Sequence, residues 1–203
     1  MNQKNTIIYF GMGCFTDTDV TVVKQLQKEY SVHWYVLHQP HDPYPVSFYA
    51  DFVKNSGVKL HMLHITNRRR SFKVLELMFK TFTEIVELSP SLIYSCCFDF
   101  YFSLAYLIKA KSIPLVFGVH DVIQHSDNRN SIFYHLSYRF SLFVGDMFLQ
   151  FSSNQNRVFK QLYPKLKSSM VGMSIKDYGE VKGEKHVFNL SLIHISEPTR
   201  PLY

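Results

Sequence analysis

The stretch Thr6-Ile7-Ile8-Tyr9-Phe10-Gly11-Met12-Gly13-Cys14-Phe15 decides the fold. Residues 6–10 are rich in β-branched and aromatic side chains, which predicts a buried strand. Residues 11–15 predict a turn, and residues 17–30 a helix, because apolar residues recur there every three or four positions. A strand that passes through a glycine turn into a helix is the opening unit of a parallel sheet flanked by helices.

The same alternation of short apolar runs and longer helical patterns continues along the chain. Further strands are predicted at 32–37, 59–65, 91–96, 114–119, 147–151 and 169–171, and helices at 48–55, 71–88, 100–111, 130–144 and 154–163. Such alternation is typical of α/β proteins with a mostly parallel sheet. We therefore expect residues 1–175 to form one Rossmann-like domain, its sheet flanked by helices.

Two of the predicted helices carry apolar stripes that we expect to face the core. In the helix at 71–88 the stripe is Phe72, Leu75, Phe79, Phe82 and Val86, and in the helix at 130–144 it is Phe133, Leu136, Phe140 and Phe143. The basic run 68–70, which is Arg-Arg-Arg, precedes the first of these helices. Either it lies in a solvated loop, or it contacts anionic lipid, which is worth about 1 kcal/mol per basic residue near the surface.

Composition indicates a globular protein with a surplus of positive charge. Hydrophobic residues make up 46% and charged residues 19%, the formal net charge is +6 and the isoelectric point is about 9.1. That surplus suits a nucleic acid, a nucleotide phosphate or an acidic membrane face. The first residues do not resemble a signal peptide, no apolar run approaches the ~20 residues that span a bilayer, and Cys14, Cys96 and Cys97 lack disulfide or metal-knuckle spacing. We expect a cytoplasmic protein.

The C-terminal stretch does not follow the pattern of the domain. Residues 176–185 are hydrophilic and predict a linker, and residues 186–189 begin a new apolar run that we interpret as the start of a missing C-terminal domain. The run Leu190-Ser191-Leu192-Ile193-His194-Ile195-Ser196-Glu197-Pro198-Thr199-Arg200 resembles the conceptual translation of a transposase-type sequencing adapter. We expect residues 190–203 to be non-native and disordered. The alternative is an ordinary frayed terminus.

Small, polar and titratable residues follow the predicted strands, where open parallel sheets bind ligands. Gly11 and Gly13 would let the backbone approach a phosphate, although a tight turn that needs glycine for its φ angles explains them equally well. His120-Asp121 follows the fifth strand, and an imidazole there can hydrogen-bond a hydroxyl or phosphate oxygen. The alternative is a loop histidine bonded to local backbone. The other acids and histidines lack metal-ligand spacing, so we expect no metal.

Three segments in this order resemble the N-terminal domain of a family-four glycosyltransferase of the two-domain GT-B architecture. They are the Gly11-Met12-Gly13 turn, the strand that ends in His120-Asp121, and Phe148-Leu149-Gln150-Phe151-Ser152-Ser153-Asn154-Gln155. The resemblance implies retaining transfer of a sugar from a nucleotide-sugar donor to a hydroxyl of a glycan or lipid-linked acceptor. It implies polysaccharide or glycolipid biosynthesis, no obligatory metal or other cofactor, no nucleic-acid partner, and peripheral contact with the cytoplasmic membrane face.

The resemblance also assigns roles to residues. Gly11, Met12 and Gly13 would lie near the donor diphosphate and the acceptor, and His120 would orient sugar or acceptor hydroxyls in the interdomain cleft. Asp121 would hold the loop or the imidazole, and Ser152 or Ser153 would line the cleft. In this family the nucleotide is held chiefly by the C-terminal domain, so we expect the present chain to lack transferase activity on its own.

Two other classes of function stay open. One is a stand-alone, non-catalytic Rossmann-like module that binds a nucleotide or nucleic acid. The other is a phosphohydrolase in which His120 and Asp121 act with a metal, which would need further ligands that converge on that pair.

Overall fold

The computed structural model describes residues 4–54, 56–66, 71–123 and 132–172, and these form helices and strands close to the predicted ranges. The strands are β1 Thr6–Met12, β2 Ser31–His38, β3 Lys59–His64, β4 Leu92–Ser95, β5 Leu115–Val119, β6 Met147–Gln150 and β7 Ser168–Met170. The helices are α1 Thr16–Leu26, α2 Val46–Val53, α3 Phe72–Glu87, α4 Phe100–Lys109, α5 Ile132–Val144 and α6 Ser153–Leu162, and a 3₁₀ turn spans Gly13–Phe15.

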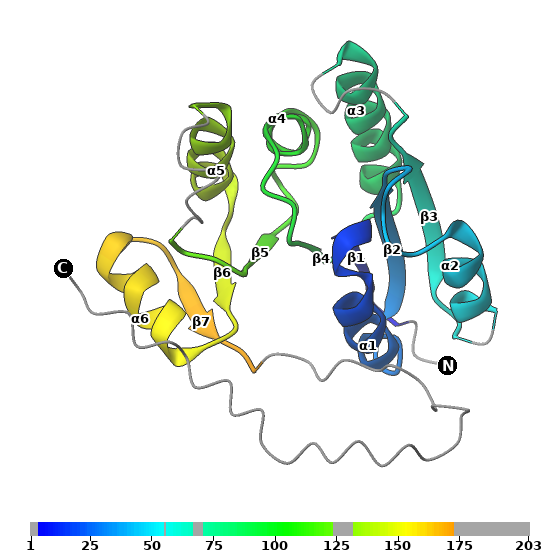
Figure 1. Ribbon diagram of the computed structural model, residues 1–203, viewed down its shortest axis with the longest axis horizontal. Helices are drawn as coiled ribbons and strands as arrows, with labels where there is room; N and C mark the ends of the chain where they lie inside the picture. The colour runs from blue at the N-terminus through cyan, green and yellow to red at the C-terminus, as the bar shows by residue number, and fades with distance from the viewer. Residues whose placement is uncertain (1–3, 55, 67–70, 124–131, 173–203) are drawn as a thin grey trace.

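The seven strands form one sheet in the order β3-β2-β1-β4-β5-β6-β7, and each neighbouring pair is parallel (Figure 1). The chain first builds outward from β1 through β2 to β3, then returns through α3 to place β4 on the other side of β1. The order therefore reverses between β1 and β4. The α/β, Rossmann-like prediction is confirmed.

Two apolar cores lie on opposite faces of this sheet. Successive residues of β1 alternate between them, because side chains of a strand point to opposite faces. Ile8 and Phe10 belong to the core under α3, α4 and α5, and Ile7 and Tyr9 belong to the core under α1 and α2. Figure 1 shows these two layers above and below the sheet. The edge helix α6 joins the first core through Phe159, whose ring centroid lies 5.3 Å from that of Phe148.

Among the described residues, helices cover only one face of the β4 to β7 half of the sheet. On the α1 side, the described residues of β4 to β7 leave a groove of about 580 Å³, with α1 as one wall. Its floor is largely apolar and partly exposed: Leu92, Tyr94, Val116, Met147 and Leu149. Parallel sheets are usually covered on both faces, so the part of the chain that the structure describes leaves an unusually large apolar surface here.

The predicted core stripe of α3 is wrong for Phe72 and Val86, whereas Leu75 and Phe79 are half-buried. Phe72 is 86% exposed and Val86 is 40% exposed, whereas Phe82 is fully buried. The buried face is Val74, Met78, Thr81, Phe82 and Ile85. Apolar residues occupy more than one face of this helix, so periodicity alone does not fix its rotation, and packing against the sheet and α4 turns the face with Val74, Met78 and Ile85 inward.

The predicted core stripe of α5 is also wrong. The buried residues of this helix are Tyr138, Ser141, Leu142 and Val144. Phe133, Leu136 and Phe143 are exposed instead, and Phe140 is half-buried. The helix is apolar nearly all round, so its periodicity did not identify the side that faces the sheet.

Several sequence-based interpretations lie outside the described residues. They concern the basic run 68–70, the linker 176–185, the apolar run 186–189 and the adapter-like tail 190–203. Within the part of the chain that the structure describes, no helix is both long and apolar enough to cross a membrane.

Candidate functional site

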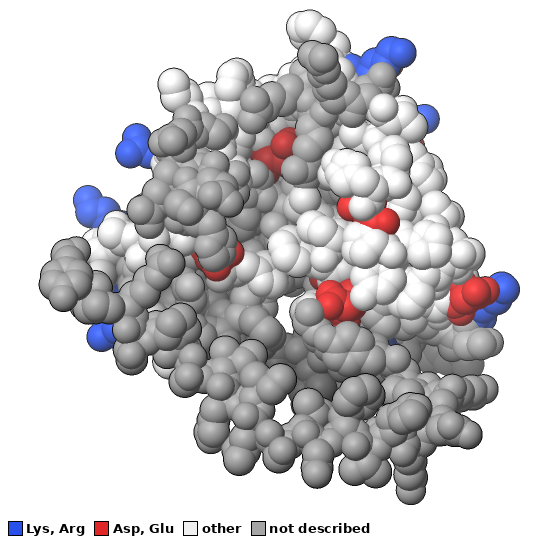
Figure 2. Space-filling model, in the orientation of Figure 1, with Lys and Arg blue, Asp and Glu red and all other residues white. Residues whose placement is uncertain are grey.

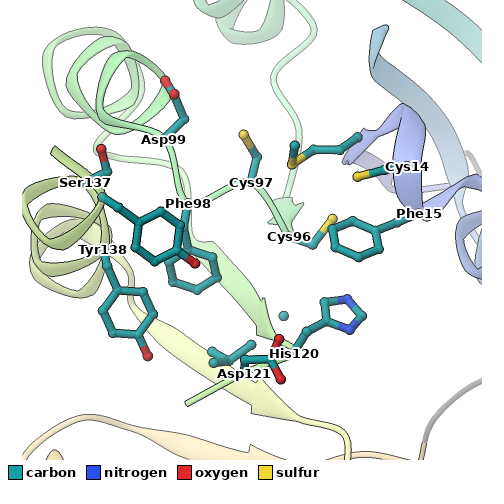
Figure 3. A pocket seen from close by; sticks show the side chains of 14 residues that line it. Cys14, Phe15, Cys96, Cys97, Phe98, Asp99, His120, Asp121, Ser137 and Tyr138 are labelled. Atoms are coloured by element: carbon teal, nitrogen blue, oxygen red, sulfur yellow. The ribbon is translucent and has the colours of Figure 1, made fainter. Parts of the chain in front are cut away.

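A cavity of about 280 Å³ opens at the carboxyl ends of β1, β4 and β5 (Figure 3). This is the place where the strand order reverses, which is where open α/β sheets bind ligands. Its lining comes from the end of β1 and the following 3₁₀ turn, from residues 96–99 after β4, from residues 118–121 around the end of β5, and from α5.

His120 is held between two aromatic rings at this cavity. It follows β5 directly, and its ring centroid lies 4.6 Å from that of Phe15, with an angle of 7° between the planes. On the other side, the centroid of Phe151 is also 4.6 Å away, at 30°. Figure 3 shows Phe15 and His120 side by side, with Asp121 next along the chain. The stacking fixes the plane of the imidazole before any ligand arrives.

The environment disfavours the charged form of the His120 imidazole. Burial lowers its pKa below the ordinary value of 6.5, and the neighbouring Asp121 carboxylate only partly opposes that effect. A neutral imidazole has one nitrogen that donates a hydrogen bond and one that accepts. His120 can therefore contact a sugar or acceptor hydroxyl in either sense, without carrying charge into the cavity.

The loop after His120 is tied to α6. The backbone N–H of Val122 donates a hydrogen bond to Oε1 of Gln155 (3.0 Å). Ser152 is the N-cap of α6, and its Oγ accepts a hydrogen bond from the backbone N–H of Gln155 (3.2 Å). Ser152 thus positions the side chain that holds the His120 loop, and it does not line the cavity or the groove. The predicted contact of Ser152 with substrate stays a prediction.

Gly11 in β1 and Gly13 just after it allow neighbouring side chains to pack close to the backbone. Gly11 lies inside β1, not in a turn, and neither Gly11 nor Gly13 has a positive φ, since among the described residues only Ser89 and Gly57 do. A Cβ on Gly11 would overlap the Asp19 carboxylate, and one on Gly13 would overlap that of Asp42. The alternative that these glycines provide unusual φ angles is therefore wrong. Neither residue lines the cavity, but Met12 between them does.

A buried carboxyl group lies beneath the site. Asp19 is 3% exposed, and its Oδ1 accepts a hydrogen bond from the Tyr9 hydroxyl (2.7 Å). Its Oδ2 and the Nε1 of Trp34 are buried without hydrogen-bond partners among the described residues. Burial raises the pKa of Asp19 to about 8, the Tyr9 hydrogen bond opposes that shift, and the Asp17 charge adds to it. Asp19 is therefore mostly neutral at pH 7.

Replacement of Asp19 by asparagine should flatten the pH dependence of stability. Between its ordinary pKa of 3.8 and about 8, the folded protein holds a proton on Asp19 that the unfolded chain releases. The free energy of unfolding therefore falls as pH rises through this window, and Asp19→Asn should remove that part of the slope. Urea titrations at pH 4 to 8 on both proteins measure it. Parallel slopes would show that Asp19 is ionised in the fold.

The carboxylate of Asp99, which lines the cavity, already has a structural role. Asp99 caps α4, since its Oδ1 accepts hydrogen bonds from the backbone N–H groups of Tyr101 (2.8 Å) and Phe102 (3.2 Å). Burial raises the pKa of Tyr134, which lines the cavity from α5. Within the described residues, His, Cys, Asp and Glu form no group of three or more that could hold a metal ion.

The structure thus brings together part of the predicted site. Met12, His120 and Asp121 line one cavity, whereas Gly11, Gly13 and Ser152 support it from outside the lining. Phe15, Phe151 and Gln155 were not predicted as site residues. Phe15 and Phe151 lie just beyond the ends of β1 and β6, so aromatic residues that follow those strands were the available signal.

The chain is similar to known proteins in structure and not in sequence. No family model matches the chain, and no curated protein matches its sequence. Among solved structures, a UDP-GlcNAc 2-epimerase from Neisseria meningitidis bound to UDP-GlcNAc has a TM-score of 0.58 and 12% identity, over 83% of this chain and 46% of that one.

Two glycosyltransferases are similar to a comparable degree. MurG from Acinetobacter baumannii has a TM-score of 0.54 and 13% identity, over 86% of this chain and 47% of that one. The lipopolysaccharide outer core galactosyltransferase WaaB has a TM-score of 0.54 and 13% identity, over 82% of this chain and 45% of that one. The chain spans about half the length of these proteins, and its fold is that of one Rossmann-like domain of the GT-B kind.

Proposed function

We propose that this chain is the acceptor-side domain of a glycosyltransferase that moves a sugar from a nucleotide-sugar to an acceptor hydroxyl. The observation that carries the proposal is the His120 ring, stacked between Phe15 and Phe151 at the point where the strand order reverses. The finer expectations belong to the same proposal: family four, retention at the sugar carbon, glycan or glycolipid acceptors, and work at the cytoplasmic membrane face.

The cavity supplies what one wall of such a site needs. A rigid neutral imidazole can hold a hydroxyl of the sugar or acceptor in one orientation, which lowers the entropic cost of reaching the transition state. Phe15 and Phe151 shield that contact from water. Asp121, the next residue, adds negative charge at the rim, which suits hydroxyl groups better than phosphates. We therefore assign the sugar and the acceptor, not the nucleotide base, to this domain.

A nucleotide-sugar 2-epimerase is the second candidate, favoured by the TM-score of 0.58 against the Neisseria meningitidis enzyme. An epimerase has to remove and return a proton at a sugar carbon, which calls for an acid and a base close together. The Asp99 carboxylate already caps α4. Asp121 and His120 would therefore have to supply the acid and the base. Product analysis separates the two reactions, because an epimerase converts the sugar without any acceptor.

Saturation-transfer NMR with the purified chain and UDP-sugars tests the proposal. We expect saturation to reach the sugar protons more strongly than the uracil protons, and His120→Ala to abolish that pattern. His64→Ala at the end of β3, outside the cavity lining, is the matched control and should behave like the parent. Saturation that favours uracil and survives His120→Ala would support the binding-module alternative. Absence of sugar saturation would refute our proposal.

A further inference from the structure

Three thiol groups line the candidate cavity. Cys14 belongs to the 3₁₀ turn after β1, and Cys96 and Cys97 directly follow β4. Cys14 is exposed, whereas Cys96 is 6% exposed and Cys97 is 1% exposed. The proposed sugar transfer needs no thiol. The cavity therefore carries reactive groups that the proposed function leaves unused.

Cys14 and Cys96 converge from neighbouring strands. The strands β1 and β4 are parallel partners, with Phe10 opposite Ser95, so both chains leave the sheet at the same edge. The sulfur of Cys96 then accepts a hydrogen bond from the backbone N–H of Met12, two residues before Cys14. The 3₁₀ turn that follows advances only about 2 Å per residue, so Cys14 stays near this contact.

Cys97 is the less suitable partner for Cys14. Its backbone N–H donates a hydrogen bond to Oγ of Ser95 (3.0 Å). In Figure 3 the side chains of Cys14 and Cys96 point toward each other, whereas Cys97 points away from both. A disulfide needs side chains directed at each other and Cα atoms about 4.4–6.8 Å apart. Cys14 and Cys96 are therefore the pair that we expect to link.

The charge around the cavity favours a small, neutral oxidant for these thiols. The described lining includes Asp99 and Asp121 but no Lys or Arg. Figure 2 likewise shows Lys and Arg mainly along the edges of the molecule, with Asp and Glu nearer the middle. Hydrogen peroxide is uncharged, so the carboxylates do not repel it as they repel an anionic disulfide such as oxidised glutathione.

We propose that Cys14 is a modification site, at which hydrogen peroxide creates a disulfide to Cys96 across the cavity. The exposed Cys14 reacts first, because burial raises the pKa of Cys96 and keeps that group a thiol. The Cys14 thiolate attacks one peroxide oxygen and the O–O bond breaks, which gives a sulfenic acid and a hydroxide that takes up the Cys14 proton. The Cys96 sulfur then attacks the Cys14 sulfur, the S–O bond breaks, and water leaves with the Cys96 proton. The pair of thiols is oxidised to a disulfide, and the peroxide is reduced to water.

The bond should alter the candidate site through Phe15. Phe15 follows Cys14 in the same 3₁₀ turn, and its ring centroid lies 4.6 Å from that of His120. Drawing Cys14 toward Cys96 moves this turn, so we expect the Phe15 ring to leave His120 and the cavity to narrow. The effect on sugar binding rests on the proposed function, but the formation of the disulfide does not.

Mass spectrometry of the full chain tests the disulfide. After hydrogen peroxide and denaturing alkylation with N-ethylmaleimide, the parent should lose a pair of hydrogen atoms and keep a single thiol of its three for alkylation. Cys97→Ser is the matched control, since Cys97 lines the same cavity, and this variant should still form the linkage. Cys14→Ser and Cys96→Ser should not form it. In Cys96→Ser, dimedone should trap the sulfenic acid of Cys14, which then has no thiol to resolve it.

Saturation-transfer NMR with UDP-sugars measures the consequence for the site. Peroxide should lower the sugar saturation of the parent to that of His120→Ala, and dithiothreitol should restore it. Peroxide should not change the saturation that Cys14→Ser shows before treatment. A disulfide that leaves the saturation of the parent unchanged would overturn the effect on the site.

Peptide mapping decides the disulfide itself. Absence of a linkage between Cys14 and Cys96, a bond to Cys97 instead, or a bond between two chains would overturn the proposal. The mapping uses no nucleotide-sugar, so its failure leaves the NMR test of the reduced protein unaffected. Absence of sugar saturation in the reduced protein refutes the proposed function and leaves the disulfide result standing.

Discussion

Replacing Phe82 by alanine should lower the free energy of unfolding by about 3–5 kcal/mol, the usual cost of emptying a buried aromatic site. Phe82 is fully buried, and its ring centroid lies 5.1 Å from that of Phe102 and 6.1 Å from that of Tyr106. The side chain therefore joins α3 to α4 above the sheet. Removing it leaves a cavity that neighbouring rings, held in their own packing, fill only in part.

The matched control lies on the same helix. Phe72 is 86% exposed, so Phe72→Ala should change the free energy of unfolding by no more than about 0.5 kcal/mol. Urea denaturation followed by circular dichroism measures both variants. Similar losses for the two would mean that α3 buries the stripe expected from its sequence and that its rotation in the structure is wrong.

Replacing Gly11 by alanine should cost about 1–3 kcal/mol, the usual range for adding a methyl group to a full core. The new Cβ would overlap the Asp19 carboxylate and lie 3.3 Å from Nε1 of Trp34. Asp19 is buried and hydrogen-bonded to Tyr9, so moving it breaks that 2.7 Å contact. Because Gly11 has no positive φ, the cost comes from crowding and not from backbone strain.

Gly172→Ala is the control for that substitution, since a Cβ there meets no atom of the described residues within 4 Å. Alanine reduces the freedom of the unfolded chain, so this variant should be neutral or stabilised by up to about 1 kcal/mol. Thermal and urea unfolding of the pair give the comparison. If Gly11→Ala is as stable as Gly172→Ala, the packing of β1 against α1 is looser than the structure has it.

The fold class could be predicted because it depends on local patterns. Each strand is a short apolar run and each helix a longer periodic one, so their alternation indicated a parallel sheet without any knowledge of contacts. The orientation of α3 and α5 could not be predicted in the same way. Both helices have apolar residues on several faces, and only the packed sheet determines whether Phe72 or Met78 turns inward.

The candidate site shows the same division. His120 was identifiable because it stands at a strand end, and the sheet geometry places such residues at one edge. Its stacking partners Phe15 and Phe151 come from the ends of two other strands, so their contacts depend on the tertiary arrangement. Ser152 stood in a similarly promising place, but its hydroxyl serves the first turn of α6, a local use that sequence position alone does not distinguish from ligand binding.

The central place of β1 also bears on how the chain folds as it is synthesised. Its pairing with β2 needs only the first 38 residues, and the small core under α1 and α2 can close soon afterwards. Its other edge waits for β4 at 92–95, and the hydrogen bond from Ser91 to Thr6 spans 85 residues. Pairing over such a separation is slow. Until β4 emerges from the ribosome, the nascent chain carries an open strand edge, the kind of surface that chaperones protect and that aggregation exploits.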